Sequence, residues 1–171
     1  NPIVSKAKGK VILVDANASG NLEVIFGDQL SQASIIQSDA ENYLSGFPLD
    51  LGANVLGSIA MSYLQGDGEV GFAASLTSNN ITAFNTSGEQ LWSVPAGGNL
   101  RTGPVIATLT NPAEPKIIAV TQNGSLLALN PDGSNMSGFP VSLTGAFLGA
   151  PAVADLNGDG KLEILACSLT G

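Results

Sequence analysis

Apolar segments of about six residues alternate with turn-forming residues along the chain. Residues 116–121 and 125–130 form two such segments, and Asn123 and Gly124 stand between them. An Asn-Gly pair in this setting predicts a β-hairpin with a type I′ turn. A shorter segment before them, 105–107, is continuously apolar, which predicts a strand buried on both faces. No segment combines a helical period with capping residues, so we expect an all-β fold.

The pattern of strands and turns repeats with a nearly constant period. Four segments superimpose, and one position in each marks the phase: Asp15, Ser62, Thr108 and Asp155, separated by 47, 46 and 47 residues. Two Gly-Phe-Pro segments, at 46–48 and 138–140, lie 92 residues apart, twice 46. Four strands in each repeat of about 40–50 residues are typical of a β-propeller blade, whereas a β-sandwich gives no reason for so regular a period.

The sequence therefore predicts a β-propeller of four-stranded antiparallel blades over residues 1–171. The expected repeats are about 9–56, 57–102, 103–148 and 149–171, and the last is incomplete, so about three and a half blades are present. A propeller closes its ring, because an open ring exposes apolar faces and unpaired strand edges. We expect a fragment of a larger propeller, in preference to closure by a second copy or a compact ring of four blades.

Charge and composition exclude several classes of function. Only 12% of the residues are charged, and six basic against fourteen acidic residues give a net charge of −8. Nucleic acids and anionic membranes need clustered Lys and Arg, so neither is an expected partner. No apolar segment reaches the roughly 18 residues of a membrane span. With no His and no Ser beside a base, we expect no enzyme activity and assign no catalytic residue.

Cys167 stands in an apolar segment and is expected in the core.

One loop in the fourth repeat carries oxygen-bearing side chains at alternate positions. Ca²⁺ takes six to eight oxygen ligands from carboxylates, amides and main-chain carbonyls. The expected ligands in this loop are Asp155, Asn157, Asp159, the main-chain carbonyl of Lys161, and Glu163. Gly160 permits the sharp bend that brings these oxygens together. The loop differs from an EF-hand, which would need Glu where Ala166 stands and helices on both sides.

The first repeat contains a weaker version of this loop. Its expected ligands are Asp15, Asn17, Ser19, the main-chain carbonyl of Asn21, and Glu23. Ser replaces one carboxylate, so we expect weaker binding of Ca²⁺. The alternative for both loops is that the polar residues only form an Asx-type turn. The second and third repeats lack the carboxylate set, at 65–68 and 111–115, and are expected to be metal-free turns. A filled coordination shell leaves no position for substrate, so the expected role of Ca²⁺ is structural.

The fourth repeat, with Gly149-Ala150-Pro151 followed by the loop that starts at Asp155, resembles the FG-GAP/VCBS repeat. That repeat forms the blades of integrin α-subunit propellers and of many secreted bacterial proteins. The resemblance is specific in the fourth repeat, good in the first and degraded in the second and third. It implies propeller blades, Ca²⁺ in the loop between the first two strands, and an adhesive or scaffolding role. Residues 81–92 also resemble the tryptophan-bearing blades of quinoprotein-like propellers.

The expected function is a calcium-stabilised binding or scaffold module, secreted or at the cell surface, for a protein or glycan ligand. The first alternative is the propeller portion of a secreted enzyme, such as a peptidase, lyase or quinoprotein, with catalytic residues outside this segment. The second alternative is a purely structural spacer. Trp92 and Phe84 are expected to pack between blades rather than bind a ligand. An exposed aromatic patch on one face would favour the binding module.

Overall fold

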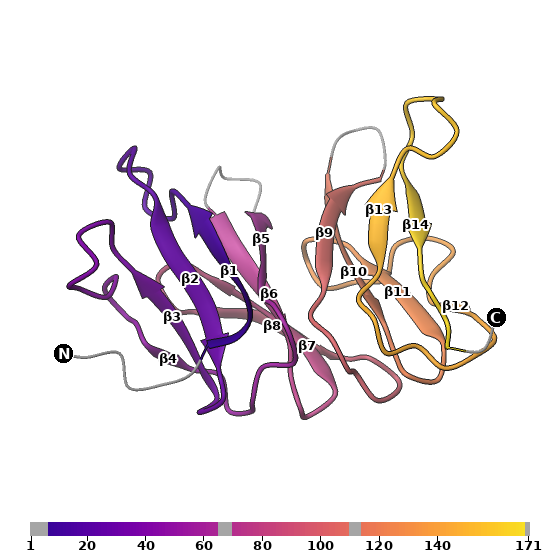
Figure 1. Ribbon diagram of the computed structural model, residues 1–171, viewed down its shortest axis with the longest axis horizontal. Helices are drawn as coiled ribbons and strands as arrows, with labels where there is room; N and C mark the ends of the chain where they lie inside the picture. Colours follow the sequence, from indigo (N-terminus) through magenta and orange to yellow (C-terminus); the bar gives the residue numbers. More distant parts are fainter. Residues whose placement is uncertain (1–6, 65–69, 110–113, 170–171) are drawn as a thin grey trace.

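The fold is all-β in the computed structural model, which describes residues 7–64, 70–109 and 114–169 (Figure 1). Three four-stranded sheets and one two-stranded sheet follow one another along the chain. No helix occurs in these three ranges, and none of their segments could therefore cross a membrane as a helix. The all-β prediction is confirmed.

Each four-stranded sheet is an antiparallel meander, in which spatial order follows sequence order. The first sheet contains β1 (Ala7–Val14), β2 (Glu23–Asp28), β3 (Gln32–Ile36) and β4 (Leu49–Asp50). The second contains β5 (Ala60–Tyr63), β6 (Val70–Ser75), β7 (Asn80–Asn85) and β8 (Gln90–Pro95). The third contains β9 (Val105–Thr108), β10 (Pro115–Val120), β11 (Ser125–Leu129) and β12 (Val141–Ser142). The two-stranded sheet pairs β13 (Ala152–Ala154) with β14 (Glu163–Leu165). These are the predicted four-stranded blades, with about three and a half of them present.

The second and third strands of each blade, rather than the first, are the buried ones. Strands β6, β7, β10 and β11 are buried except at their first residues, and β2 and β3 are nearly so. The opening strands β1, β5 and β9 are half-buried or exposed. The prediction that an apolar opening strand is buried on both faces is therefore wrong. Each opening strand pairs on one side only, so its other edge lacks a neighbouring strand.

Five turns within the described sheets share one backbone geometry. A residue in the left-handed region closes each turn, with φ between +57° and +89° at Ala40, Asn79, Gly88, Gly124 and Gly133. The main-chain N–H of each of these residues donates to the carbonyl three residues earlier. This geometry is a type I turn followed by a left-handed residue. The predicted type I′ turn is wrong, because it needs positive φ at both central residues and Asn123 does not have it.

The hydrophobic cores lie between blades. Phe47 of the first repeat contacts Phe72 of β6 with ring centroids 6.2 Å apart, and Phe72 stacks on Phe84 of β7 at 5.2 Å. Between the second and third sheets, the Trp92 Nε1–H donates to the carbonyl of Pro131 at 2.6 Å. The predicted packing of Trp92 and Phe84 between blades is confirmed. A third cluster joins the third sheet to β13 and β14. Each sheet therefore shares its core with its neighbours.

Glycines allow direct main-chain contact where successive blades begin. A Cβ on Gly9 would overlap the main chain at Gly57, and a Cβ on Gly103 would overlap the carbonyl oxygen of Ser58. The Lys10 N–H also donates to the Ser58 hydroxyl at 2.8 Å. By contrast, Gly149, one repeat beyond Gly103, has no atom within 4 Å of its ideal Cβ position. A side chain at Gly103 would therefore push the second and third blades apart.

We expect Gly103→Ala to destabilise the protein by about 3 kcal/mol or more, because overpacking a contact made of main-chain atoms cannot be relieved by a rotamer change. Gly149→Ala is the matched control, and its effect should stay within about 1 kcal/mol. Denaturant unfolding followed by tryptophan fluorescence measures both variants. Equal stabilities for the two variants would show that the main-chain contact does not hold the blades together.

Candidate functional site

The two predicted calcium loops adopt the same backbone arrangement in different blades. They connect β1 to β2 and β13 to β14, and both project from the upper side of the molecule in Figure 1. In the first loop, the Gly20 N–H donates to Asp15 Oδ2 at 2.8 Å. In the second, the Gly160 N–H donates to Asp155 Oδ2 at 2.9 Å. The structure thus gathers the predicted residues into two separate loops, one at each end of the row of sheets.

The loop of the fourth repeat is closed by its own side chains. Both oxygens of Asp155 accept main-chain hydrogen bonds, from Gly158 at 2.7 Å and Gly160 at 2.9 Å. These two N–H groups, Gly160 first, hold the pKa of the Asp155 carboxyl below its ordinary value. Asn157 Oδ1 accepts from the Asp159 N–H, and Asp159 Oδ1 accepts from the Lys161 N–H. All these oxygens therefore point toward the interior of the loop.

A glutamate at the ninth position closes each loop at its base. Glu163 Oε2 accepts the Leu156 N–H at 2.8 Å, and Glu23 Oε2 accepts the Ala16 N–H at the same distance. Glu23 is only 1% exposed, whereas Glu163 is half-buried. Burial of a carboxylate disfavours its charge unless donors or a cation compensate. The first loop thus holds a deeply buried carboxylate at the position predicted to complete the coordination shell.

The remaining polar residues of the first loop make similar hydrogen bonds, but a hydroxyl, that of Ser19, stands where the other loop has a carboxylate. The Ser19 N–H donates to Asp15 Oδ1 at 2.9 Å and to Asn17 Oδ1 at 3.0 Å. Asn21 donates its N–H to the Ser19 hydroxyl at 3.3 Å. Ala18 has φ +56°, where the fourth-repeat loop has Gly158 at +78°. A left-handed conformation costs an L-residue about 1–2 kcal/mol, so this loop is held in a conformation that Ala does not favour.

The donor set of both loops is made of oxygen atoms, which suits a hard cation such as Ca²⁺. A carboxylate that accepts a main-chain hydrogen bond keeps further lone pairs for a metal. Across the described ranges, however, no three Asp, Glu, His or Cys side chains form a group that could hold a metal by themselves. Coordination would therefore depend on the Asn side chains, the hydroxyl of Ser19 and main-chain carbonyls as much as on carboxylates.

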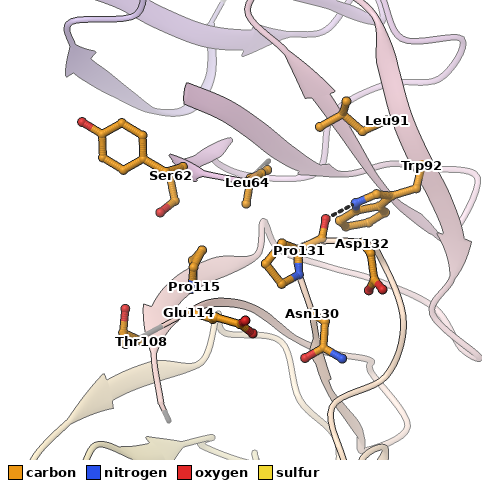
Figure 2. A pocket seen from close by; sticks show the side chains of 11 residues that line it. Ser62, Leu64, Leu91, Trp92, Thr108, Glu114, Pro115, Asn130, Pro131 and Asp132 are labelled. Carbon is orange, nitrogen blue, oxygen red and sulfur yellow. Dashed lines mark hydrogen bonds between the residues drawn. The ribbon is translucent and has the colours of Figure 1, made fainter. Parts of the chain in front are cut away.

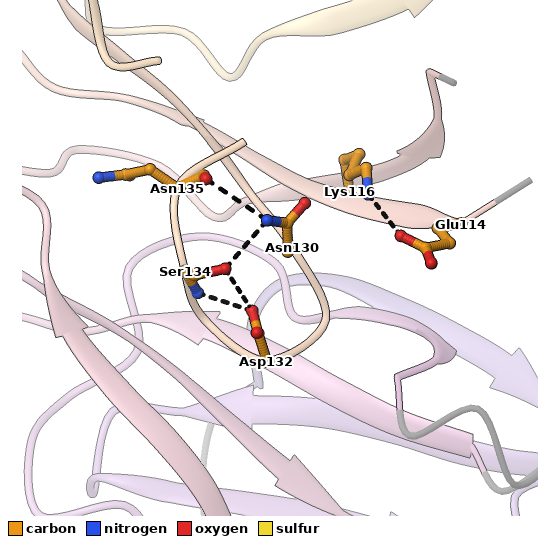
Figure 3. Close-up of polar contacts among 6 residues, drawn as sticks. All are labelled: Glu114, Lys116, Asn130, Asp132, Ser134 and Asn135. Carbon is orange, nitrogen blue, oxygen red and sulfur yellow. Dashed lines mark hydrogen bonds and ion pairs between the residues drawn. The ribbon is translucent and has the colours of Figure 1, made fainter. Parts of the chain in front are cut away.

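The corresponding loops of the second and third repeats are described only in part. Residues 65–68 and 111–113, which belong to the predicted metal-free turns, lie outside the described residues. Ser62, in β5, and Thr108, at the end of β9, stand at the positions where the other two repeats have Asp. Glu114 forms an ion pair with Lys116 at 2.9 Å (Figure 3).

A groove between the second and third sheets was missed by the sequence analysis. Its volume is about 990 Å³, and we call it the Tyr63 groove. Its polar and aromatic lining includes Ser62, Tyr63, Thr108, Glu114, Asn130 and Asp132 (Figure 2). An equivalent groove of about 550 Å³ lies between the first and second sheets, and Tyr63 lines this groove as well. The only signal in the sequence was an aromatic residue directly after the phase-marking Ser62.

A polar network fixes the turn that forms one wall of this groove (Figure 3). Asp132 Oδ1 accepts from the Ser134 hydroxyl at 2.6 Å and from the Ser134 N–H at 2.9 Å. These bonds, the hydroxyl first, hold the pKa of the Asp132 carboxyl below its ordinary value. Asn130 Nδ2 donates to the Ser134 hydroxyl oxygen at 2.9 Å. One oxygen of the Asp132 carboxylate, Oδ1, thus accepts both hydrogen bonds from Ser134.

The position of Cys167 contradicts the sequence prediction. Its side chain is exposed rather than part of the core. The residue follows β14, at the free edge of the two-stranded sheet, where no further strand covers it among the described residues.

Comparison with known proteins supports the fold but names no family. No protein-family model matches the sequence, and no curated protein matches it. The FG-GAP/VCBS resemblance therefore stays a prediction.

Solved structures with β-propeller folds do resemble the chain. One is BBS1N, in a crystal structure of its complex with ARL6DN that was soaked with lead. It aligns with a TM-score of 0.72 and 13% sequence identity, and the alignment covers 98% of this chain and 50% of BBS1N. The V. cholerae biofilm matrix protein Bap1 aligns with a TM-score of 0.65 and 16% identity, covering 95% and 28%. The chain thus spans half or less of these two neighbours. At such identities the likeness shows the fold alone, which is of the β-propeller type.

We expect Ser134→Ala to raise the pKa of Asp132 toward its ordinary value, because the hydroxyl is the main donor that stabilises the carboxylate. A carboxylate whose pKa is lower in the folded than in the unfolded protein stabilises the fold at pH values above its unfolded-state pKa. That stabilisation is lost as the pH falls through the folded-state pKa. In the variant this stabilisation should be smaller, and its loss should be complete at a higher pH than in the wild type. Carboxyl ¹³C NMR titration measures the change, with Asp155 as the internal control that should not move. An unchanged midpoint for Asp132 would rule out this role of the hydroxyl.

Proposed function

We propose that this chain is a calcium-stabilised β-propeller module that presents its loops and grooves to a protein or glycan ligand outside the cell. The observation that carries the proposal is the shared arrangement of the two acidic loops, which stand 140 residues apart in the sequence. A neighbour of the same fold, BBS1N, was crystallised with a protein partner, ARL6DN, which supports a binding role for such a module.

In this proposal each loop wraps one Ca²⁺ ion. The stronger site uses side-chain oxygens of Asp155, Asn157, Asp159 and Glu163 and the main-chain carbonyl of Lys161. The weaker site uses Asp15, Asn17, Ser19 and Glu23 and the main-chain carbonyl of Asn21. Since Ser19 stands where the stronger loop has Asp159, the first loop has one negative charge fewer. Ca²⁺ would supply positive charge at the loop centre, and the protein side chains would only bind it and fix the loop.

The expected energetic effect of Ca²⁺ is modest. Extracellular modules bind Ca²⁺ with a Kd of about 10⁻⁴–10⁻³ M. At about 1 mM Ca²⁺, mass action then adds roughly 0.4–1.4 kcal/mol of stability per site. Such an amount stiffens a loop without creating the fold. The abundance of Ca²⁺ outside cells is also why we place the protein in a secreted or cell-surface setting.

We expect 1 mM Ca²⁺ to raise the melting temperature of the wild-type protein by a few degrees, relative to chelator. Asp159→Ala should abolish the stronger binding event in isothermal titration calorimetry, because it removes a charged ligand. Asp39→Ala is the matched control. Asp39 is also an exposed aspartate, and it accepts main-chain hydrogen bonds from Glu41 and Asn42 in an ordinary turn. If Ca²⁺ leaves the wild-type melting temperature unchanged, the structural role of the metal is refuted.

We also propose that further blades, or a second copy of the chain, pack against the outer faces of the first and last sheets. Leu156 is 62% exposed, whereas Ala16, at the equivalent position of the first repeat, is 5% exposed and packs against the second sheet. Leu13 on β1 and Leu169 after β14 are also exposed. Exposed apolar side chains on the two outer sheets favour association through these faces.

The isolated chain should therefore self-associate in size-exclusion chromatography coupled to light scattering. Leu156→Asp should shift it toward a monomer of 17.2 kDa, because a charge at this surface opposes burial. Leu30→Asp is the control, since Leu30 is equally exposed but lies in the turn between β2 and β3. A wild-type protein that is monomeric at all concentrations would disprove this packing.

A further inference from the structure

The Tyr63 groove, between the second and third sheets, has the features of a preformed ligand site. Small-ligand sites are concave, of about 300–1,000 Å³, with a few polar groups on a rigid frame. The volume of about 990 Å³ lies at the top of this range. In Figure 2, Ser62 on β5 stands across the opening from Thr108 and Glu114. Each side of the groove therefore belongs to a different blade.

Two of the four residues at this position in the repeats are exposed: Leu156, at 62%, on the last sheet, and Tyr63, at 61%. The other two are Ala16, which is buried between the first two sheets, and Leu109, which packs on the cluster beside β10 and β11. Because the third sheet is already in place next to it, the exposure of Tyr63 does not come from a missing neighbour. An aromatic ring is thus held at the opening of two adjacent grooves.

The frame of the groove is rigid. The Trp92 indole donates its N–H to the carbonyl of Pro131 at 2.6 Å (Figure 2). A Cβ on Gly133 would lie only 2.8 Å from the indole ring, so the ring packs directly on the main chain of the third blade. Trp92 therefore supports the wall, and Tyr63 remains as the aromatic surface open to a ligand.

The lining combines neutral hydrogen-bonding groups with two carboxylates, those of Glu114 and Asp132. Of the described residues that line the groove, none is Lys or Arg. The Glu114 carboxylate is paired with Lys116, and the Asp132 carboxylate accepts two hydrogen bonds from Ser134. Ser62 and Thr108 provide hydroxyls where the first and fourth repeats have carboxylates. Anionic ligands are disfavoured by the net charge of −8, and a cationic ligand would find one carboxylate of the lining, that of Asp132, without a cationic partner among the described residues, so hexalysine serves as the competing probe.

We propose that the Tyr63 groove binds a neutral oligosaccharide. Sugar hydroxyls both donate and accept, as the hydroxyls of Ser62 and Thr108 do, and the apolar C–H face of a pyranose matches the exposed tyrosine ring. Tyrosine gives such contact area at a small loss of conformational entropy. This inference rests on the proposed binding function and specifies its ligand class. It is independent of Ca²⁺, because the groove lies outside both acidic loops.

The test uses three neutral hexasaccharides, namely cellohexaose, maltohexaose and chitohexaose, with hexagalacturonate and hexalysine as charged probes. Saturation-transfer NMR detects binding, and calorimetry measures affinity. We expect at least one neutral hexasaccharide to bind with a Kd in the millimolar range or tighter, and neither charged probe to bind as well. Tyr63→Ala should weaken that binding by about tenfold or more, and Thr108→Val by a smaller factor. Tyr63→Phe should retain most of the affinity.

Leu30→Ala is the matched control, because Leu30 has the same exposure as Tyr63 but lies away from the groove. Equal losses in Leu30→Ala and Tyr63→Ala would overturn the proposal, as would binding of hexalysine alone or of no neutral hexasaccharide. The calcium-dependent rise in melting temperature, measured on the same samples, shows that Tyr63→Ala is folded. If that rise is present in the wild type while the neutral sugars fail to bind, the sugar site is refuted and the calcium module stands.

Discussion

At the start of the first three blades, the main chain of one repeat lies directly against the main chain of the next, at Gly9, Gly57 and Gly103. No side chain fits in these contacts, so the separation of neighbouring blades is set by backbone dimensions. The shared cores then have a fixed gap to fill. Phe47, Phe72 and Trp92 occupy it between successive sheets. The grooves that open beyond these cores therefore have walls whose spacing does not depend on flexible side chains.

The acidic loops and the lining of the grooves both include the position near the end of the opening strand of a repeat. In the first and fourth repeats the opening strand is followed by Asp, and the loop folds onto that carboxylate. In the second and third repeats this position holds a hydroxyl residue, Ser62 or Thr108, which lines the groove between the blades. The two kinds of repeat thus differ in the residue type at this position and in the carboxylates that follow it.

The period of the sequence was sufficient to predict the sheets, because a repeat of 46 or 47 residues leaves room for four short strands and little else. The turn at Asn123 and Gly124 was predicted with the wrong geometry, since the dipeptide does not reveal how many residues the loop contains. Cys167 and the opening strands were wrongly placed for a related reason: apolar composition does not show whether a neighbour covers a strand. Tyr63 was overlooked because its exposure depends on how two blades meet, which no local pattern encodes.

Because every core is shared by two adjacent sheets, the molecule behaves as a one-dimensional array with nearest-neighbour coupling. Adding or removing one whole repeat recreates a blade junction of the same kind at the same backbone spacing. The architecture can therefore change its number of blades by duplication or loss of a 46-residue unit. Specialised positions such as Tyr63 can then diverge in one repeat while the others maintain the frame.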